Sequence, residues 1–291
     1  MAKKKQKEKE GMEDRLTRFV DEVVHAALSE DIGPGDITTE ALISKTKRGS
    51  AEIVAKEPMV IAGQFVARRA FELLDKRIKY TVLIPDGVEV KEGTVIATVK
   101  GPLRAVLTAE RVALNFLQRL SGVATLTASF VEKLAGTGVG ILDTRKTTPC
   151  LRLLEKYAVK AGGGVSHRFG LFDAVLIKDN HIESSGGIAK AVIKVRRKYP
   201  TGVIVEVECR TLKEVKEAIT AEADIIMLDN MDMEKTKKAV KLIKGRALTE
   251  ASGGVTLKSV KGTARCGVDF ISVGALTHSA RALDINLRIS T

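Results

Sequence analysis

The sequence predicts an α/β fold in which parallel strands form a short or incomplete barrel. In the second half of the chain, six short apolar runs alternate with helical segments, as strands joined by helices do. Nearly every run ends in charged or small polar residues. Strand ends converge on one mouth in a barrel but gather only near the switch point of an open sheet, so six such ends favour the barrel. The expected strands are Val139–Leu142, Ala174–Ile177, Val203–Val207, Ile225–Leu228, Ala247–Thr249 and Phe270–Val273, with helices at Ile188–Lys198, Leu212–Ala221 and Met233–Lys244.

The first half of the chain has a different pattern. Apolar spacing predicts an amphipathic helix from Asp14 to Leu28, followed by a turn-rich segment with glycines and a proline. Residues 49–101 read as strands broken by one helix near Phe65–Leu74, and the alternation over residues 86–101 predicts an antiparallel hairpin. A long helix is expected from Thr108 to about Leu134.

Composition limits the class of protein. The chain has 291 residues, 44% of them apolar, which is enough for a substantial core. The chain has no run of 18 apolar residues, so no membrane span is expected. Residues 1–12 form a basic tail without the apolar stretch of a signal peptide, and we expect the tail to be disordered. Three widely spaced cysteines indicate neither a disulfide framework nor a zinc site, as in a cytoplasmic protein.

The formal net charge of +12 indicates anionic partners, which include nucleic acids, phosphorylated metabolites and carboxylates. Aromatic residues make up only 4% of the chain and tryptophan is absent, which disfavours a base-stacking surface. A nucleic-acid-binding protein remains one hypothesis, with the basic tail as its arm. It would need its charge on an exposed face, whereas the cations of the motifs lie at strand ends.

In the stretch from Leu142 to His181, four of the cations and two histidines lie beside short apolar runs and three consecutive glycines. A core does not accommodate so many charges, whereas a site for a multiply charged anion requires them. Arginine suits bidentate recognition of carboxylates and phosphates, and lysine supplies a compact charge. These residues are Arg145, Lys146, His167, Arg168, Lys178 and His181.

Two glutamates on one strand are candidates for the opposite side of the site. Glu206 and Glu208 are two residues apart, so they face the same way, with Val205 and Val207 opposite. Carboxylates inside a barrel either pair with its cations as structural partners or hold ribose hydroxyls or a magnesium ion. The sequence leaves both possibilities open.

Two glycine-rich segments, residues 250–255 and 272–276, have the pattern of strand–loop–helix junctions. Their backbone N–H groups can approach an anion, and two adjacent junctions in a barrel form a phosphate site. Lys178, at a strand end, is a Schiff-base nucleophile, an anion contact or a solvent-facing lysine. His167, His181 and His278 lack the spacing of metal ligands.

Nine ordered motifs resemble those of the quinolinate phosphoribosyltransferase family, and together they span all of the chain except the basic tail. The motifs are E-D-I-G-x-G-D-I-T-T at 30–39, T-A-E-R-V-A-L-N-F-L-Q-R-L-S-G-V-A-T at 108–125, D-T-R-K-T-T-P at 143–149, A-G-G-G-x-x-H-R-x-G-L-x-D at 161–173, L-I-K-D-N-H at 176–181, V-E-V-E at 205–208, L-D-N at 228–230, E-A-S-G-G at 250–254 and G-V-D-F-I-S-V-G-A-L-T-H-S at 267–279.

The resemblance implies an N-terminal α/β sandwich, residues 13–114, beside an incomplete α/β barrel, residues 115–278. A C-terminal helix, within residues 279–291, is expected to return to the sandwich. The family further implies a homodimer, or an assembly of dimers, in which the sandwich of one subunit covers the barrel mouth of the other. No membrane or nucleic-acid partner is implied.

The reaction implied by the resemblance joins the ring nitrogen of quinolinate to C1 of phosphoribosyl pyrophosphate. Pyrophosphate and carbon dioxide leave, and the product is nicotinate mononucleotide, a precursor of NAD. Mg²⁺ accompanies the pyrophosphate and is the expected cofactor. Because quinolinate has two carboxylates and the second substrate is a polyanion, the cationic stretch suits both.

By motif, each implied role falls on residues of this sequence. Lys178, Glu206 and Asp229 are the expected catalytic residues, with Glu206 and Asp229 holding the ribose and Mg²⁺, directly or through water. Arg111 is expected to reach the site from the partner subunit. The expected substrate-binding set is Arg145, His167, Arg168 and Lys178 for quinolinate, Lys146 for phosphoribosyl pyrophosphate, and Ser252, Gly253, Gly274 and His278 for phosphate.

One departure and two alternatives accompany the resemblance. Ser166 stands where the family more often has asparagine, a change that leaves His167 and Arg168 in place. A paralogous group associated with molybdenum transport shares the fold and several motifs. The other alternative is a barrel lyase or aldolase that forms a Schiff base through Lys178.

Overall fold

The computed structural model describes residues 2–290, and side chains are described for residues 16–289. The chain divides into two compact units, residues 1–125 with 281–291, and residues 126–280. The boundary expected at residues 114/115 therefore lies eleven residues earlier than the observed one. Both positions fall within one continuous helix, α4 (Leu103–Lys133), so no turn marks the change of unit in the sequence. The tail expected to be disordered, residues 1–12, instead belongs from Ala2 onward to helix α1 (Ala2–Ile32), and its side chains lie outside the described ones.

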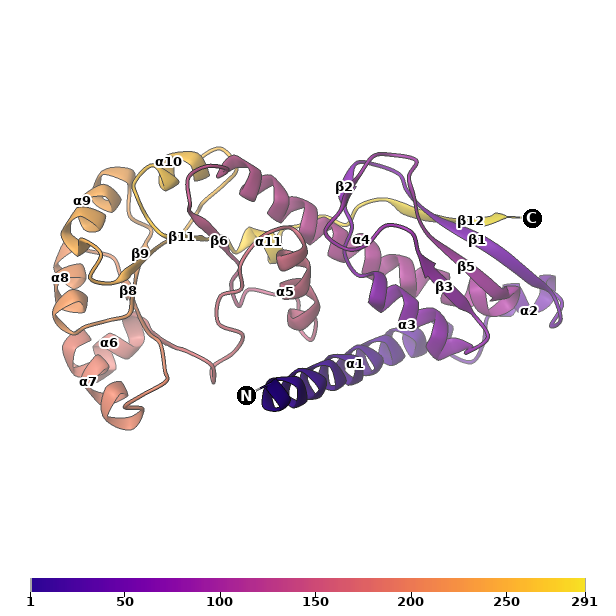
Figure 1. Ribbon diagram of the computed structural model, residues 1–291, viewed down its shortest axis with the longest axis horizontal. Coiled ribbons are helices and arrows are strands. Elements are labelled where there is room, and N and C mark those ends of the chain that lie inside the picture. Colours follow the sequence, from indigo (N-terminus) through magenta and orange to yellow (C-terminus); the bar gives the residue numbers. More distant parts are fainter. Residues whose placement is uncertain (1, 291) are drawn as a thin grey trace. The chain divides into compact units, whose positions relative to one another are not determined.

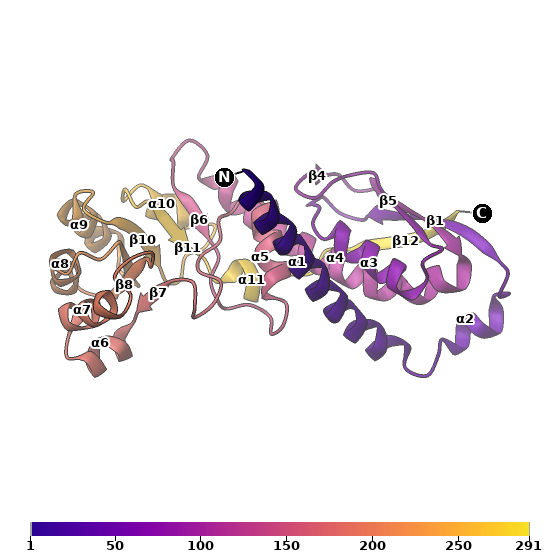
Figure 2. The same ribbon diagram turned by 60° about the horizontal axis from the view of Figure 1, so that its bottom comes forward.

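The first unit is built on a four-stranded antiparallel sheet with the order β12-β1-β5-β3. Figures 1 and 2 show helices α3 and α4 along one face of this sheet. The core between them contains the fully buried side chains of Ile53, Phe71, Ile96, Leu114 and Leu117. The elements are α1 (Ala2–Ile32), α2 (Ile37–Leu42), β1 (Arg48–Ala55), β2 (Met59–Val60), α3 (Gln64–Leu74), β3 (Lys79–Val82), β4 (Glu89–Val90), β5 (Val95–Pro102), α4 and β12 (Ile285–Ser290).

Two expectations for this unit are wrong. The segment over residues 86–101 is not a hairpin, since β4 pairs with β2 while β5 pairs with β1 and β3. Alternation determines which face a side chain occupies but not which strand is the partner. The C-terminal segment returns to this unit as expected, but as strand β12 against β1 instead of as a helix. Apolar residues at every second position, from Ile285 to Ile289, suit a strand.

The returning segment is fixed by a close approach to α4. A Cβ on Gly122 would clash with the carbonyl oxygen of Arg281, so only glycine fits there. Next to this crossing, Leu283 donates its N–H to the carbonyl of Gln118 at 3.1 Å, and the Gln118 amide donates to the carbonyl of Ile285 at 2.8 Å.

The second unit contains six parallel strands in the order β6-β11-β10-β9-β8-β7. The sheet curves, with helices α7 to α10 on its outer side (Figure 1), and β6 and β7 are its edges, so it is an incomplete barrel as predicted. The elements are β6 (Gly140–Leu142), α5 (Arg152–Ala161), β7 (Val175–Ile177), α6 (Asp179–Ser185), α7 (Ile188–Lys198), β8 (Val205–Cys209), α8 (Leu212–Thr220), β9 (Ile225–Asp229), α9 (Met233–Ile243), β10 (Leu248–Ser252), α10 (Val260–Ala264), β11 (Phe270–Ser272) and α11 (Ala275–His278).

The register of the strands places a row of polar residues at their carboxyl ends. Ser252 on β10 lies between Asp229 on β9 and Ser272 on β11. On β8, Val205 and Val207 are fully buried on one face, and the two glutamates point to the other. The carboxyl end of this sheet therefore carries the candidate site.

Candidate functional site

Glu206, His167 and Glu250 form a buried group at the inner face of the barrel. The Nε2 atom of His167 lies 3.2 Å from Oε2 of Glu206 and 3.5 Å from Oε2 of Glu250. The second oxygen of each glutamate is buried without a hydrogen-bond partner among the described residues. Two unsatisfied carboxylate oxygens beside one imidazole are costly unless the group retains protons or binds a ligand.

Proton sharing explains part of this arrangement. Burial lowers the pKa of His167, but the hydrogen bonds to Glu206 and Glu250 outweigh it and raise that pKa to about 10. Burial, followed by the charge of Glu250, raises the pKa of Glu206. The backbone N–H of Arg168 points at Nδ1 of His167 at 2.7 Å, a contact that requires a lone pair on Nδ1 and so opposes the full protonation of the ring that the two carboxylates favour. The shared proton therefore lies between Nε2 and the two carboxylates.

The same three residues offer one nitrogen and two oxygen ligands within 4.8 Å of one another, a possible metal-ion set that sequence spacing did not indicate. A histidine that ligates a metal through Nε2 carries its proton on Nδ1 and donates it to an acceptor. Here Nδ1 itself accepts a hydrogen bond from Arg168. The residues thus fit a proton better than a metal ion.

A second group of charges surrounds Arg210, which sequence reasoning did not select. Its guanidinium lies 3.0 Å from Asp179, 3.3 Å from Glu208 and 3.3 Å from Asp229. Lys178 Nζ lies 3.8 Å from Glu208. Arg210 continues the alternation of Glu206 and Glu208, and that spacing was the available signal. Burial and the charge of Asp229 raise the pKa of Glu208, while Lys178 and Arg210 lower it.

Arg145 and Arg168 converge, as the cationic stretch suggested. Burial, then the charge of Arg145, lowers the pKa of Arg168. The Nε atoms of both arginines are buried and have no hydrogen-bond partner among the described residues. Two guanidinium groups that repel each other and retain unused donors form a site for an anion.

Lys146, Gly274 and His278 come together at another point of the strand ends. A Cβ added to Gly274 would lie 3.1 Å from Nε2 of His278 and 3.2 Å from Cδ of Lys146. Thr277 fixes this arrangement by donating its hydroxyl proton to the carbonyl of Lys146 at 2.8 Å. A lysine, an imidazole and the backbone of a glycine can surround a phosphate.

Residues 250–255 were expected to lead from a strand through a short loop directly into a helix, and they do not. Helix α10 begins only at Val260, so the loop does not open directly into a helix. Gly253 has φ +104°, and a Cβ there would clash with the amide of Asn230. Glycine is thus required for Ser252 and Asn230 to meet, and Asn230 donates its N–H to the Ser252 carbonyl at 2.8 Å.

The remaining candidates have these positions. Arg111 is exposed on α4, in the first unit. His181 caps α6, where its Nδ1 accepts from the N–H of Lys178 at 3.1 Å. The Ser166 hydroxyl oxygen is buried without a partner among the described residues. Lys178 is half exposed, and Glu206 and Asp229, expected to act together, have their described contacts in separate groups.

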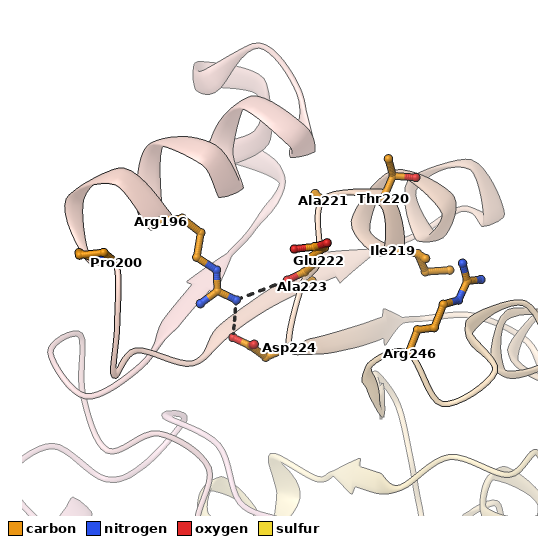
Figure 3. A pocket seen from close by; sticks show the side chains of 9 residues that line it. All are labelled: Arg196, Pro200, Ile219, Thr220, Ala221, Glu222, Ala223, Asp224 and Arg246. Atoms are coloured by element: carbon orange, nitrogen blue, oxygen red, sulfur yellow. Dashed lines mark hydrogen bonds and ion pairs between the residues drawn. The ribbon is translucent and has the colours of Figure 1, made fainter.

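A pocket of about 930 Å³ lies at the opposite ends of the strands, between the amino ends of β9 and β10 (Figure 3). Arg196 lines it and pairs with Asp224 at 2.8 Å. Asp224 also accepts a hydrogen bond from the N–H of Val205 at 2.6 Å. These groups satisfy one another and join neighbouring strands, so the ion pair and the hydrogen bond stabilise the barrel. The pocket lies at the amino ends of the strands and is separate from the site.

None of the described helices is long and apolar enough to span a membrane. Cys150, Cys209 and Cys266 are all free thiols.

Comparisons with known proteins find similarity over both units of the chain. The profile of the quinolinate phosphoribosyl transferase N-terminal domain matches residues 36–121, and that of its C-terminal domain matches residues 123–288. The "Probable nicotinate-nucleotide pyrophosphorylase (carboxylating)" of Bacillus subtilis is 46% identical over 261 residues, which are 90% of each chain. A mitochondrial quinolinate phosphoribosyltransferase (decarboxylating) of Nicotiana tabacum is 45% identical, covering 93% of this chain and 82% of its own. The solved nicotinate-nucleotide pyrophosphorylase of Francisella tularensis superposes with a TM-score of 0.91 at 44% identity, over 94% and 96% of the two chains.

Proposed function

The chain belongs to the quinolinate phosphoribosyltransferase family, and we propose that it transfers the phosphoribosyl group of phosphoribosyl pyrophosphate to the ring nitrogen of quinolinate. Pyrophosphate leaves C1 of the sugar, the C2 carboxylate leaves as carbon dioxide, and nicotinate mononucleotide forms for NAD synthesis. The observation that supports this most is the convergence of Arg145 and Arg168 with unused donors. Two guanidinium forks suit a ring with two adjacent carboxylates.

The charges of the site divide between the two substrates. Arg145, Arg168 and Lys178 bind the carboxylates of quinolinate, with His167 beside them. Lys146 and the phosphate-binding residues Ser252, Gly253, Gly274 and His278 bind the sugar phosphate and pyrophosphate. Lys146 lies against Gly274 and His278, which supports a common phosphate contact for these three.

The chemistry requires charge stabilisation more than a nucleophile. Displacement at C1 passes through an oxocarbenium-like transition state, which a carboxylate beside the ribose stabilises. Glu206 and Asp229 are the proposed residues for this role. After transfer, the ring nitrogen is cationic, and it stabilises the electron pair left on C2 when carbon dioxide departs. No Schiff base is needed, so Lys178 acts as a cation.

Magnesium is the proposed cofactor, and the carboxylate donors near the strand ends suit this ion. Asp229 would hold it together with the pyrophosphate oxygens, and the ion would neutralise charge on the leaving group. Asp229 and Glu208 are already close enough to share one guanidinium, that of Arg210, which supports a cation site at this face.

We extend the proposal to a homodimer, or an assembly of dimers, in which Arg111 of one subunit completes the site of another. The exposure of Arg111 on α4 is compatible with such a contact. A cytoplasmic location is also proposed, because three free cysteines suit a reducing compartment.

The test is a stoichiometric assay with quinolinate labelled at the C2 carboxylate. Purified protein, Mg²⁺ and phosphoribosyl pyrophosphate should release labelled carbon dioxide and pyrophosphate in equal amounts with nicotinate mononucleotide. Nicotinate in place of quinolinate should give no carbon dioxide. Borohydride added with quinolinate should leave Lys178 unmodified. A folded protein that releases no pyrophosphate in response to quinolinate would overturn the proposal.

A further inference from the structure

Asp143 and Lys156 form a buried ion pair that the proposed reaction does not use. The Lys156 Nζ atom lies 2.5 Å from Oδ1 of Asp143, and the two side chains are 5% and 0% exposed. Burial raises the pKa of Asp143 and lowers that of Lys156, although each charge opposes the shift of the other. Burying two charges is costly, and an apolar pair often serves stability as well. A reason beyond stability is therefore needed.

The hydrogen bonds of this pair supply the reason. Oδ1 of Asp143 accepts the backbone N–H of His167 at 2.8 Å. Lys156 donates to the backbone carbonyl of the same residue at 3.0 Å. Both main-chain polar groups of His167 are thus held by one ion pair.

The neighbouring backbone is aligned in the same way. Val165 donates its N–H to the carbonyl of Ile141 at 2.8 Å, and Asp143 donates its N–H to the carbonyl of Val165 at 3.2 Å. Residues 165–167 therefore run beside the end of β6, and the ion pair fixes the last step of this alignment.

The alignment determines where two arginines stand. Arg145 follows Asp143 by two residues, and Arg168 directly follows His167. Their like charges oppose close approach, and after burial the charge of Arg145 is the next cause that lowers the pKa of Arg168. In the free protein, the backbone of the two segments acts together with the hydrogen bond from Arg168 Nη1 to the carbonyl of Ala174 at 3.2 Å, and both oppose this repulsion.

We infer that Asp143 and Lys156 are positioning residues, which hold the His167 backbone so that Arg145 and Arg168 converge on the carboxylates of the substrate. This inference rests on the proposed function. Neither residue contacts the substrate. Their loss should weaken quinolinate binding while the phosphate end of the site remains intact.

The first test is Lys156→Met, which keeps the length of the side chain and removes its charge and donors. We expect the Kd for quinolinate to rise at least fivefold, and the KM for phosphoribosyl pyrophosphate to change less than twofold. Quinolinate binding is measured by calorimetry and the KM by pyrophosphate release. A purely structural pair would lower thermal stability without separating the two substrates.

Two further variants keep the result interpretable. The double variant Asp143→Asn with Lys156→Met removes both buried charges, so it should regain stability relative to Lys156→Met. It still lacks the donor to the His167 carbonyl, so its quinolinate affinity should stay reduced. If Lys156→Met does not fold, the double variant is measured in its place. Arg196→Met, at the far end of the same unit, is the control and should lower stability without affecting either substrate.

The outcomes separate the inference from the proposed function. Wild-type protein without quinolinate-dependent activity would overturn the proposed function itself. An active wild type with unchanged quinolinate affinity in Lys156→Met, or in the double variant, would overturn only the positioning role. Equal losses for both substrates would also contradict it.

Discussion

Arg145 is a residue whose shape matters as much as its charge. Replacing it by lysine keeps the positive charge but removes the planar fork that grips a carboxylate with two hydrogen bonds. We expect Arg145→Lys to bind quinolinate at least tenfold more weakly, a loss of about 1.4 kcal/mol, in a calorimetric titration. Arg246→Lys, an arginine beside the distant pocket, serves as control and should bind normally. Near-normal affinity of Arg145→Lys would exclude this role.

Asp229 can be compared with a matched residue at the other end of β9, because Asp224 directly precedes this strand and Asp229 is its last residue. Asp229→Asn keeps size and removes charge, so turnover with phosphoribosyl pyrophosphate should fall at least tenfold and the Mg²⁺ dependence should shift. Quinolinate binding to the free protein should change little. Steady-state rates over a Mg²⁺ series measure the effect.

The control for this prediction is Asp224→Asn, which should lower the melting temperature and leave the Mg²⁺ dependence unchanged. If Asp229→Asn instead weakened quinolinate binding and kept a normal response to Mg²⁺, the carboxylate face would be assigned to the wrong substrate.

Strand β8 carries Glu206, which belongs to the buried group with His167, and Glu208, which belongs to the group around Arg210. The two glutamates can therefore be compared in an experiment on pH and stability. The folded-state pKa of His167, about 10, lies above the ordinary histidine value of 6.5, so the group of His167, Glu206 and Glu250 binds its shared proton more tightly in the folded protein than in the unfolded chain. The resulting stability is present below pH 6.5 and is lost as the pH rises toward 10. Glu206→Gln removes one carboxylate that raises this pKa, so the fall in melting temperature from pH 7 to 9.5 should become smaller.

Glu208→Gln is the matched control, because Glu208 lies two residues along the same strand and its described contacts are with Lys178 and Arg210. Its melting temperature should fall with pH as steeply as that of the wild type. An unchanged slope in Glu206→Gln would show that the proton does not reside in the His167 group.

Elements were predictable where a local pattern determines them. Helix α7 has the expected bounds, Ile188–Lys198, and the barrel strands lie where apolar runs are followed by polar residues. The pairing of β4 and β5 was not predictable, because alternation contains no information on partners. The same holds for the site. Its strand-end residues were predictable, because each follows an apolar run in the sequence. The links through Arg210 and Lys156 were missed, because they join side chains that meet only after folding.

At the scale of the whole molecule, the chain combines two units that a sequence pattern cannot delimit, because α4 runs through both. The family profiles place their division at residues 121–123, and the compact units divide at residues 125/126. Arg111 lies in the first unit, whereas the other proposed site residues lie in the second. If two subunits share a site, the position of Arg111 in a different unit from the other site residues has a functional explanation.

Complementation between two inactive variants tests the shared site. Arg111→Ala and Lys178→Ala should each be inactive alone, because each removes a cation from every site. In a mixed dimer, one of the two sites receives both substitutions and the other receives neither, provided that Arg111 acts in trans. Mixing and exchanging the subunits should therefore restore activity, up to half of the wild-type value per mixed dimer. If subunit exchange is demonstrated by differential labelling and activity stays absent, Arg111 acts within its own subunit or outside the site.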